Sequence, residues 1–172
     1  MRAGRQKPDE ETSKDVIIRG LVISEESIAK AHDYVVGEWG GHPGFRDRAS
    51  LEFVCHNTGN LLRKLLTGRE NDLFECAGYF LHSIVTKHPF WDGNKRTGYI
   101  ISKALLSQFG FSVEAEEDEI TDFLVKVAKY EKGQEYAKEW LEKHGKGELE
   151  VRRMEFSFGK GVVEILSFLR RK

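Results

Sequence analysis

The sequence predicts a mostly helical domain with short β elements near both ends of the chain. Apolar residues recur at intervals of three and four through most of the segment 24–144, which is the spacing of helices that bury one face. β-Branched or alternating apolar residues stand out in the stretches 15–23 and 148–158, which indicates strands there. The chain has 172 residues, of which 40% are hydrophobic, and this suits a single core.

The first elements follow from local capping signals. Residues 1–14 are polar, and we expect them to form a flexible tail before a strand at 15–23. Ser24 is a good N-cap, and the two glutamates after it complement the dipole of a helix. We therefore expect a helix from Ser24 to about Trp39.

The middle of the chain contains a turn and two helices. Residues 40–44, Gly-Gly-His-Pro-Gly, favour a turn. Asp47 caps the helix that follows, with Gly59 as an expected interruption. Asn71 or Asp72 caps the next helix, which is apolar over much of its surface. We expect this helix to be the central buried one.

Pro89 ends the central helix, because the residue before a proline is displaced from helical angles. Asn94 is expected to cap a new helix that stops at Gly110, and a short extended stretch follows it. The acidic run Glu116–Glu119 opens a further helix. Gly133 separates that helix from the last helix of the bundle.

The end of the chain, residues 148–172, is expected to be a strand–helix extension packed on the domain formed by residues 15–147. Its helix, Val162–Leu169, has a broad apolar face, which completes the core of this domain or, as the alternative, binds a partner. We expect the strand of the extension to pair with residues 15–23, because neither stretch can satisfy its backbone groups alone.

Charge and hydropathy exclude several classes of protein. The net charge is −1, from 27 basic and 28 acidic residues, whereas direct binding to nucleic acid or to anionic membranes requires a basic excess. No apolar run approaches the roughly 20 residues that span a bilayer, and the start of the chain lacks the apolar stretch of a signal peptide. Cys55 and Cys76 fit buried thiols of a reducing compartment, so we expect a cytoplasmic protein.

The segment His88–Arg96, His-Pro-Phe-Trp-Asp-Gly-Asn-Lys-Arg, places polar residues and glycine between two apolar helices. A helix that begins at Asn94 leaves its first backbone N–H groups unpaired, and such a site attracts phosphate. Gly93 allows an anion to approach closely. Lys95 and Arg96 add positive charges that oppose the helix dipole unless an anion is bound. The segment therefore has the parts of a phosphate-binding site.

Two further side chains add chemistry to this segment. The Asp92 carboxylate, beside bound phosphates, can hold Mg²⁺. His88 titrates near neutral pH and can accept a proton from an attacking hydroxyl. Together these parts suit phosphoryl-type transfer. From the residues alone, an incidental polar loop is an equally good interpretation, because cap residues followed by Lys-Arg are common at solvated helix ends.

The segment resembles the motif of the Fic family, which is His-Pro-Phe-x-x-Gly-Asn followed by a variable position and arginine. It is closest to the Doc (death on curing) branch, which carries Asn-Lys-Arg-Thr, as at Asn94–Thr97. AMP-transferring Fic enzymes carry glycine in place of Lys95. The turn at 40–44 and the Asp-Leu-Phe-Glu at 72–75 also resemble Doc, and the resemblance extends over about residues 24–144.

The resemblance implies a Fic-type helical bundle with a small β-hairpin flap beside the active site. It implies that His88 is the general base and that Asp92 holds Mg²⁺ or orients the histidine. The residues implied in catalysis are His88, Asp92, Lys95 and Arg96. The residues implied in nucleotide and phosphate binding are Gly93, Asn94, Lys95, Arg96 and Thr97. The flap residues implied in target binding are Gly41, His42, Pro43, Gly44 and Phe45.

The activity implied is that of a Doc-like toxin, which moves a phosphoryl group from ATP to a serine or threonine hydroxyl of a protein such as an elongation factor Tu-like translation factor. An antitoxin would be the partner of such a toxin. Two alternatives stay open. Pro89 and Gly93 are closer to the Fic pattern and favour AMP transfer. A catalytically inert binding module is the other alternative, and the completeness of the motif counts against it.

Overall fold

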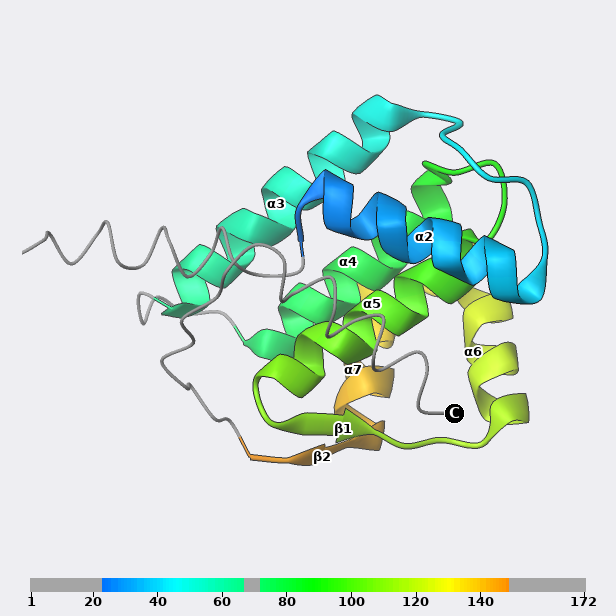
Figure 1. Ribbon diagram of the computed structural model, residues 1–172. Helices are drawn as coiled ribbons and strands as arrows, with labels where there is room; N and C mark the ends of the chain where they lie inside the picture. Colours follow the sequence, from blue (N-terminus) through cyan, green and yellow to red (C-terminus); the bar gives the residue numbers. More distant parts are fainter. Residues whose placement is uncertain (1–22, 67–71, 149–172) are drawn as a thin grey trace, which may run out of the picture.

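Six helices and two short strands make up the part of the chain that the computed structural model describes, residues 23–66 and 72–148 (Figure 1). The helices are α2 (Glu25–Trp39), α3 (Arg48–Leu66), α4 (Leu73–Lys87), α5 (Asn94–Gln108), α6 (Glu117–Ala128) and α7 (Gln134–His144). The strands are β1 (Phe111–Val113) and β2 (Gly145–Gly147). The prediction of a mostly helical fold is confirmed.

Helix α4 is the centre of the fold, as the sequence predicts. It packs against α3, α5, α6 and α7, and Phe80 and Leu81 on it are fully buried. Asp72 caps α4, because its side chain accepts a hydrogen bond of 2.6 Å from the backbone N–H of Glu75. A helix held on several sides in this way has little freedom to move. Its C-terminal end is therefore a firm support for the residues that follow.

Helices α2 and α3 begin at the predicted caps. The Ser24 hydroxyl accepts a hydrogen bond of 3.2 Å from the backbone N–H of Ser27, and the Asp47 carboxylate accepts one of 3.1 Å from that of Ser50. The expected interruption at Gly59 is wrong, because α3 runs through it without a break. Buried residues on both sides of the glycine, Thr58 and Leu62, hold the helix against the core.

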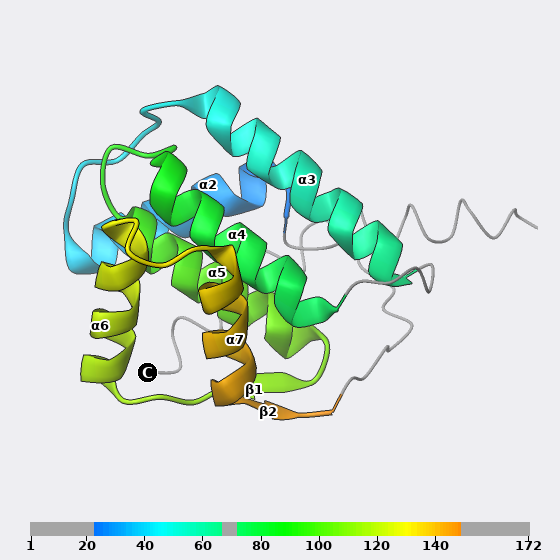
Figure 2. The same cartoon turned by 180° about the vertical axis from the view of Figure 1, so that it is seen from behind.

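Helix α7 lies directly on α4, and Figure 2 shows it crossing in front of the central helices when the molecule is seen from behind. Gly78 of α4 is the point of closest approach. A Cβ atom there would lie 2.8 Å from the backbone nitrogen of Lys138 in α7. The two backbones can approach this closely because residue 78 has no side chain.

The small sheet joins two segments that are far apart in the sequence. β1 and β2 pair in antiparallel fashion, with Phe111 opposite Gly147 and Val113 opposite Gly145. The extended stretch after Gly110 is therefore confirmed, but its pairing with residues 145–147 was not predicted. A glycine-lysine-glycine segment carries no strand signal. The predicted strand 15–23, apart from Ile23, and the predicted extension 148–172, apart from Glu148, lie outside the described residues.

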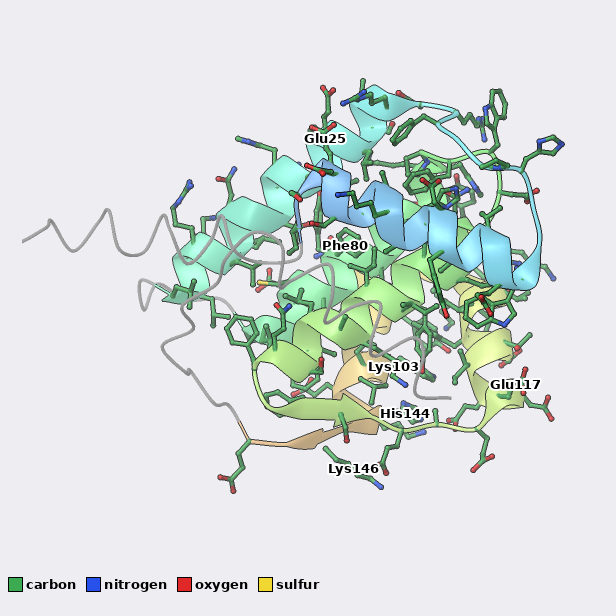
Figure 3. All side chains as sticks on the ribbon, in the orientation of Figure 1. Glu25, Phe80, Lys103, Glu117, His144 and Lys146 are labelled. Carbon is green, nitrogen blue, oxygen red and sulfur yellow. The ribbon has the colours of Figure 1, made fainter. Side chains whose placement is uncertain are left out.

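The apolar side chains form two clusters on either side of α4. One joins the inner faces of α4 to α7, and its members include Leu81, Val127 and Leu141. The other joins α2 and α3 to α4 and α5, and it includes Phe80 and Phe90. Figure 3 shows Phe80 in the interior and Glu25, Glu117 and Lys146 at the periphery. Because Phe90 belongs to the second cluster, the polar segment that contains it is anchored in the core.

Both cysteines carry free thiols, and burial raises the pKa of each to about 12. Cys76 is fully buried, as predicted, whereas Cys55 is half-buried. Among the helices of residues 23–66 and 72–148, none combines the length and the apolar character needed to cross a bilayer.

Candidate active site

His88 stands at the end of the central helix. It is the C-cap of α4 and has left-handed backbone angles, φ 50° and ψ 58°, because Pro89 does not allow the helix to continue. This conformation costs an L-residue roughly 1 kcal/mol, and such strain is typical of functional sites. Partial burial, followed by the positive charges of Arg46 and Lys95, lowers the pKa of His88. The imidazole is therefore neutral at pH 7 and able to accept a proton.

Main-chain hydrogen bonds join the loop after His88 to the segment before α3. The Pro89 carbonyl accepts two of them, from the N–H groups of Arg46 at 2.8 Å and Asp47 at 3.0 Å. The N–H of Trp91 donates to the Gly44 carbonyl at 3.2 Å. Phe45 and Phe90 form a single antiparallel bridge. In Figure 1 the two loops accordingly run side by side at one end of the bundle.

The segment implied as a flap has a different structure from the one expected. Residues 40–47 form an irregular loop rather than a β-hairpin, because their carbonyl and N–H groups pair with the loop at 89–91 and not with each other. Gly40, Gly41 and Gly44 have φ values of 77°, 131° and 99°, which are unfavourable for other residues. The five residues implied in target binding, Gly41–Phe45, are exposed or half-buried beside the motif.

Asn94 has a role that the sequence did not suggest. It is the first residue of α5 and not its cap, so the prediction of Asn94 as N-cap is wrong. Its buried side chain accepts a hydrogen bond of 3.0 Å from the N–H of Phe90 and donates one of 2.8 Å to the Phe90 carbonyl. The N-cap is Gly93, with φ 70°, and no side chain caps the helix there. The first N–H groups of α5 are therefore left open to an anion.

The charged residues of the motif are exposed around this helix start. Lys95 and Arg96 lie on the first turn of α5, and Arg96 donates a long hydrogen bond of 3.4 Å to the carbonyl of Trp39. Asp92 is also exposed, and its Oδ2 accepts a hydrogen bond of 3.2 Å from the N–H of His42. The structure thus brings His88, Asp92 and the two cations to one end of the bundle.

Phe90 of the motif, and Thr97 just after the motif, face inward. Phe90 is 1% exposed and Thr97 is fully buried. The Thr97 hydroxyl lies 3.3 Å from Nδ1 of His32, a buried histidine on the inner face of α2. The available signal was the imidazole itself, since a polar ring on the apolar face of a helix needs a reason to be there.

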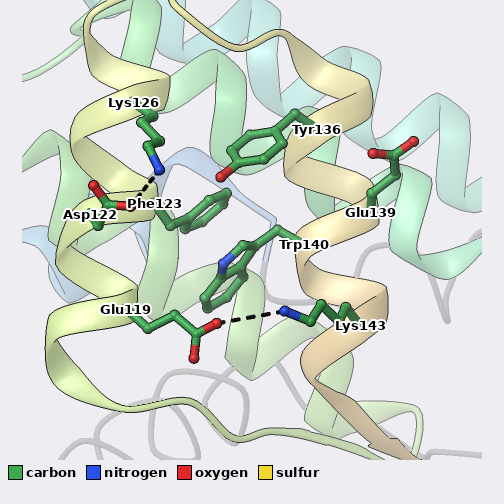
Figure 4. Close-up of a pocket in the computed structure, with 8 residues that line it drawn as sticks. All are labelled: Glu119, Asp122, Phe123, Lys126, Tyr136, Glu139, Trp140 and Lys143. Carbon is green, nitrogen blue, oxygen red and sulfur yellow. Dashed lines mark hydrogen bonds and ion pairs between the residues drawn. The ribbon is translucent and has the colours of Figure 1, made fainter.

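A cavity of about 320 Å³ lies between α6 and α7, and no motif residue lines it (Figure 4). The stacked rings of Phe123 and Trp140, 4.1 Å apart, are part of its lining. Two of its acidic residues pair with its lysines: Asp122 with Lys126, and Glu119 with Lys143. These pairs leave the cavity without a strong excess of either charge, and we do not include it in the candidate site.

The arrangement at residues 88–96 suits chemistry on a phosphate. A half-buried histidine with a lowered pKa, an uncapped helix start, two exposed cations and an exposed carboxylate lie together at one end of the bundle. The open N–H groups and the cations favour a multiply charged anion, and His88 lies close enough to Lys95 for the charge of Lys95 to lower its pKa. A phosphate ester with a nucleophile beside it fits these requirements.

Comparison with known proteins agrees with this interpretation. The profile of the Fic/DOC family matches residues 22–106. The protein kinase doc of Escherichia phage P1 is 29% identical over 106 residues, which are 62% of this chain and 81% of that protein. A Fido domain-containing protein of Dictyostelium discoideum is 36% identical over 67 residues, which are 36% of this chain and 47% of that protein.

The matched range contains α2 to α4, most of α5, the loop at 40–47 and the whole motif. Family members are transferases of phosphorus-containing groups and use ATP. Residues 88–96, whose arrangement suits chemistry on a phosphate, lie within the matched range. On this match and these relatives, the chain belongs to the Fic/DOC family.

Proposed function

We propose that this protein transfers the γ-phosphoryl group of ATP to a serine or threonine hydroxyl of a protein target. The observation that carries the proposal is the position of His88: a neutral imidazole, with the positive charge of Lys95 acting on it, beside the uncapped start of α5. The likeness to the phage protein kinase doc supports phosphoryl transfer over other reactions of the family.

In the reaction, the hydroxyl oxygen of the target forms a bond to the γ-phosphorus while the bond from that phosphorus to the β,γ-bridging oxygen breaks. The hydroxyl proton passes to the imidazole of His88, and ADP leaves. The open N–H groups of α5, with Lys95 and Arg96, stabilise the charge on the phosphates. Gly93 adopts the left-handed conformation, φ 70°, in which it caps α5 without a side chain that could occupy these N–H groups.

Asn94 and Thr97 contribute through the shape of the loop. The amide of Asn94 is committed to the backbone of Phe90, and the side chain of Thr97 is fully buried. We therefore propose that these two residues hold the phosphate-binding backbone in place and that their side chains do not touch the nucleotide. This differs from the direct contact that the family resemblance implied.

The donor set fits Mg²⁺ held jointly by the protein and the nucleotide. Asp92 offers one exposed carboxylate, and no group of three or more metal-ligating side chains occurs within residues 23–66 and 72–148. Mg²⁺ often binds through one or two carboxylates, with phosphate oxygens and water as its other ligands. Bound in this way it would supply charge neutralisation on the phosphates, and Asp92 would be its protein ligand.

AMP transfer is the second candidate, and Gly93 favours it. Here the target hydroxyl would attack the α-phosphorus and pyrophosphate would leave. Lys95 argues for phosphoryl transfer, because a long ammonium side chain occupies space that glycine leaves free for a nucleotide phosphate. Replacement of Lys95 by glycine is therefore expected to weaken transfer or to change the group transferred. Transfer of the same group at the same rate would show that Lys95 does not orient the nucleotide.

The test uses ATP labelled at either the α or the γ phosphorus. Purified protein is incubated with each label and with candidate targets, including elongation factor Tu, and the proteins are then separated. Label from γ alone supports the proposal, and label from α supports AMP transfer. If ATP binds but neither label is transferred to any target, the protein does not act on the targets tested, and the result supports a binding module. The His88→Ala protein is the control for incorporation that does not depend on the base.

Two consequences concern partners. The exposed segment Gly41–Phe45 would hold the target chain beside His88. If the protein is a toxin, its expression should arrest growth, and His88→Ala should abolish the arrest. Co-expression with genomic fragments from the source organism that restore growth would then identify an antitoxin.

A further inference from the structure

His32 is an unusual residue at its position. It lies on the inner face of α2 among core residues such as Ile28 and Val35, and it is 1% exposed. Burial lowers its pKa, although the charges of Asp33 and Asp92 act in the opposite direction, so the ring is neutral at pH 7. Among the residues that the structure describes, its Nε2 has no hydrogen-bond partner. A phenylalanine would fill similar space without leaving a buried nitrogen unpaired.

The ring contacts the active-site loop at three places. It stacks on Phe90, with the ring centroids 3.8 Å apart and the planes 8° from parallel. It lies beneath Gly93, where an added Cβ atom would be 3.3 Å from Cε1 of the ring. Its Nδ1 shares a hydrogen bond of 3.3 Å with the Thr97 hydroxyl on the first turn of α5. One side chain therefore touches the start, the N-cap and the helical end of the phosphate-binding segment.

These contacts complement the two hydrogen bonds by which the Asn94 amide holds the backbone of Phe90, called here the Asn94 clamp. The Asn94 amide fixes the backbone of Phe90 from within the loop, whereas His32 supports the side chain of Phe90 from a different helix. What an imidazole adds to an aromatic core residue is the bond to Thr97. That bond joins α2 to the turn of α5 whose N–H groups are open.

We infer that His32 is a positioning residue of the active site, which holds residues 90–97 in the shape that binds phosphate through its stacking on Phe90 and its hydrogen bond to Thr97. The effect of His32 on the shape of the loop follows from the contacts in the free protein. The effect on nucleotide affinity rests on the proposed function.

The test uses four variants of the full chain. His32→Phe keeps an aromatic ring but removes the hydrogen bond, and Thr97→Val removes the other end of the same bond with almost no change in shape. Their double variant completes a cycle. His82→Phe is the matched control, because His82 is a half-buried histidine of α4 whose pKa burial also lowers and which makes no contact with the motif among those described above.

The first measurement is amide hydrogen exchange in the free protein. His32→Phe should raise the exchange rate of the Phe90 and Thr97 amides by roughly five- to tenfold, the range for one lost hydrogen bond, relative to the Leu141 amide in α7. Thr97→Val should raise the exchange rates of the same amides by a similar factor, and the double variant should raise them no further than either single variant does. His82→Phe should change all these amides equally or not at all.

The second measurement is ATP binding by calorimetry. His32→Phe should weaken binding by a similar factor, and His82→Phe should not. If His32→Phe shifts every amide equally and leaves ATP affinity unchanged, His32 is a core residue and the inference is wrong. If the wild-type protein does not bind ATP, the proposed function fails, but the exchange measurement still tests His32. Should His32→Phe not fold, unchanged exchange in Thr97→Val would overturn the inference by itself.

Discussion

Replacing Asn94 with alanine is expected to lower the free energy of unfolding by about 1–5 kcal/mol. The substitution removes both hydrogen bonds to Phe90, and the freed N–H and carbonyl groups belong to a residue that is 1% exposed. Each buried group left without a partner costs about 1–3 kcal/mol. Alanine returns up to about 0.7 kcal/mol through its higher helix propensity. The difference between these contributions gives the expected range.

The assay is urea denaturation followed by circular dichroism, with the slope of the transition used to confirm that both proteins unfold alike. Asn60→Ala is the matched control, because Asn60 is a half-buried helical asparagine of α3 that bonds to the side chains of His56 and Arg63. It should change the stability by less than about 0.5 kcal/mol. Asn94→Asp keeps an acceptor for the Phe90 N–H but sets a carboxylate against the Phe90 carbonyl, so it should also destabilise. A loss below about 1 kcal/mol for Asn94→Ala would refute the clamp.

Three further predictions concern catalysis and packing. His88→Ala should reduce transfer by about 10²-fold or more with folding intact, because it removes the base; full activity in the folded variant would exclude that role. In the wild-type protein, kcat/KM should fall as the pH is lowered, with the midpoint of this fall below pH 6.5, because the pKa of His88 is lowered. Lys95→Gln should move this midpoint to higher pH, because it removes a positive charge that disfavours protonation of His88. An unmoved midpoint would show that another group titrates. Gly78→Ala should lower the stability by about 1–3 kcal/mol or more, because its Cβ would overlap the Lys138 backbone. Gly59→Ala, whose Cβ would have nothing within 4 Å, should raise the stability by up to about 1 kcal/mol. Equal shifts in melting temperature for the two variants would contradict the close contact between α4 and α7.

The sequence predicted features that depend on neighbouring residues. The caps at Ser24, Asp47 and Asp72 were identified because a cap and the N–H group it binds are three residues apart. The order of the helices followed from the 3.6-residue period. The end of α4 at the residue before Pro89 was also predictable, since that proline acts on its immediate neighbour.

Features that depend on distant partners were not predictable in this way. His32 and Thr97 are 65 residues apart, and nothing near either residue indicates their contact. The loop at 40–47 was expected to pair with itself, yet the fold brings residues 89–91 to it. Asparagine is a common N-cap residue, but Gly93 takes the cap position here with a left-handed conformation, and the Asn94 amide hydrogen-bonds to Phe90. The pairing of residues 148–158 with 15–23 stays a prediction.

The bonds between Pro89 and the segment before α3 have a consequence for the evolution and engineering of this protein. They run from backbone to backbone, so no change of side chain removes them as long as the glycine conformations are kept. The exposed side chains of His42, Pro43 and Trp91 can then change while the backbone of residues 89–91 keeps its shape. A library randomised at these three positions should yield mostly folded proteins that differ in the targets they select. Under the proposed function, target choice and chemistry would thus be encoded in separable parts of one short surface.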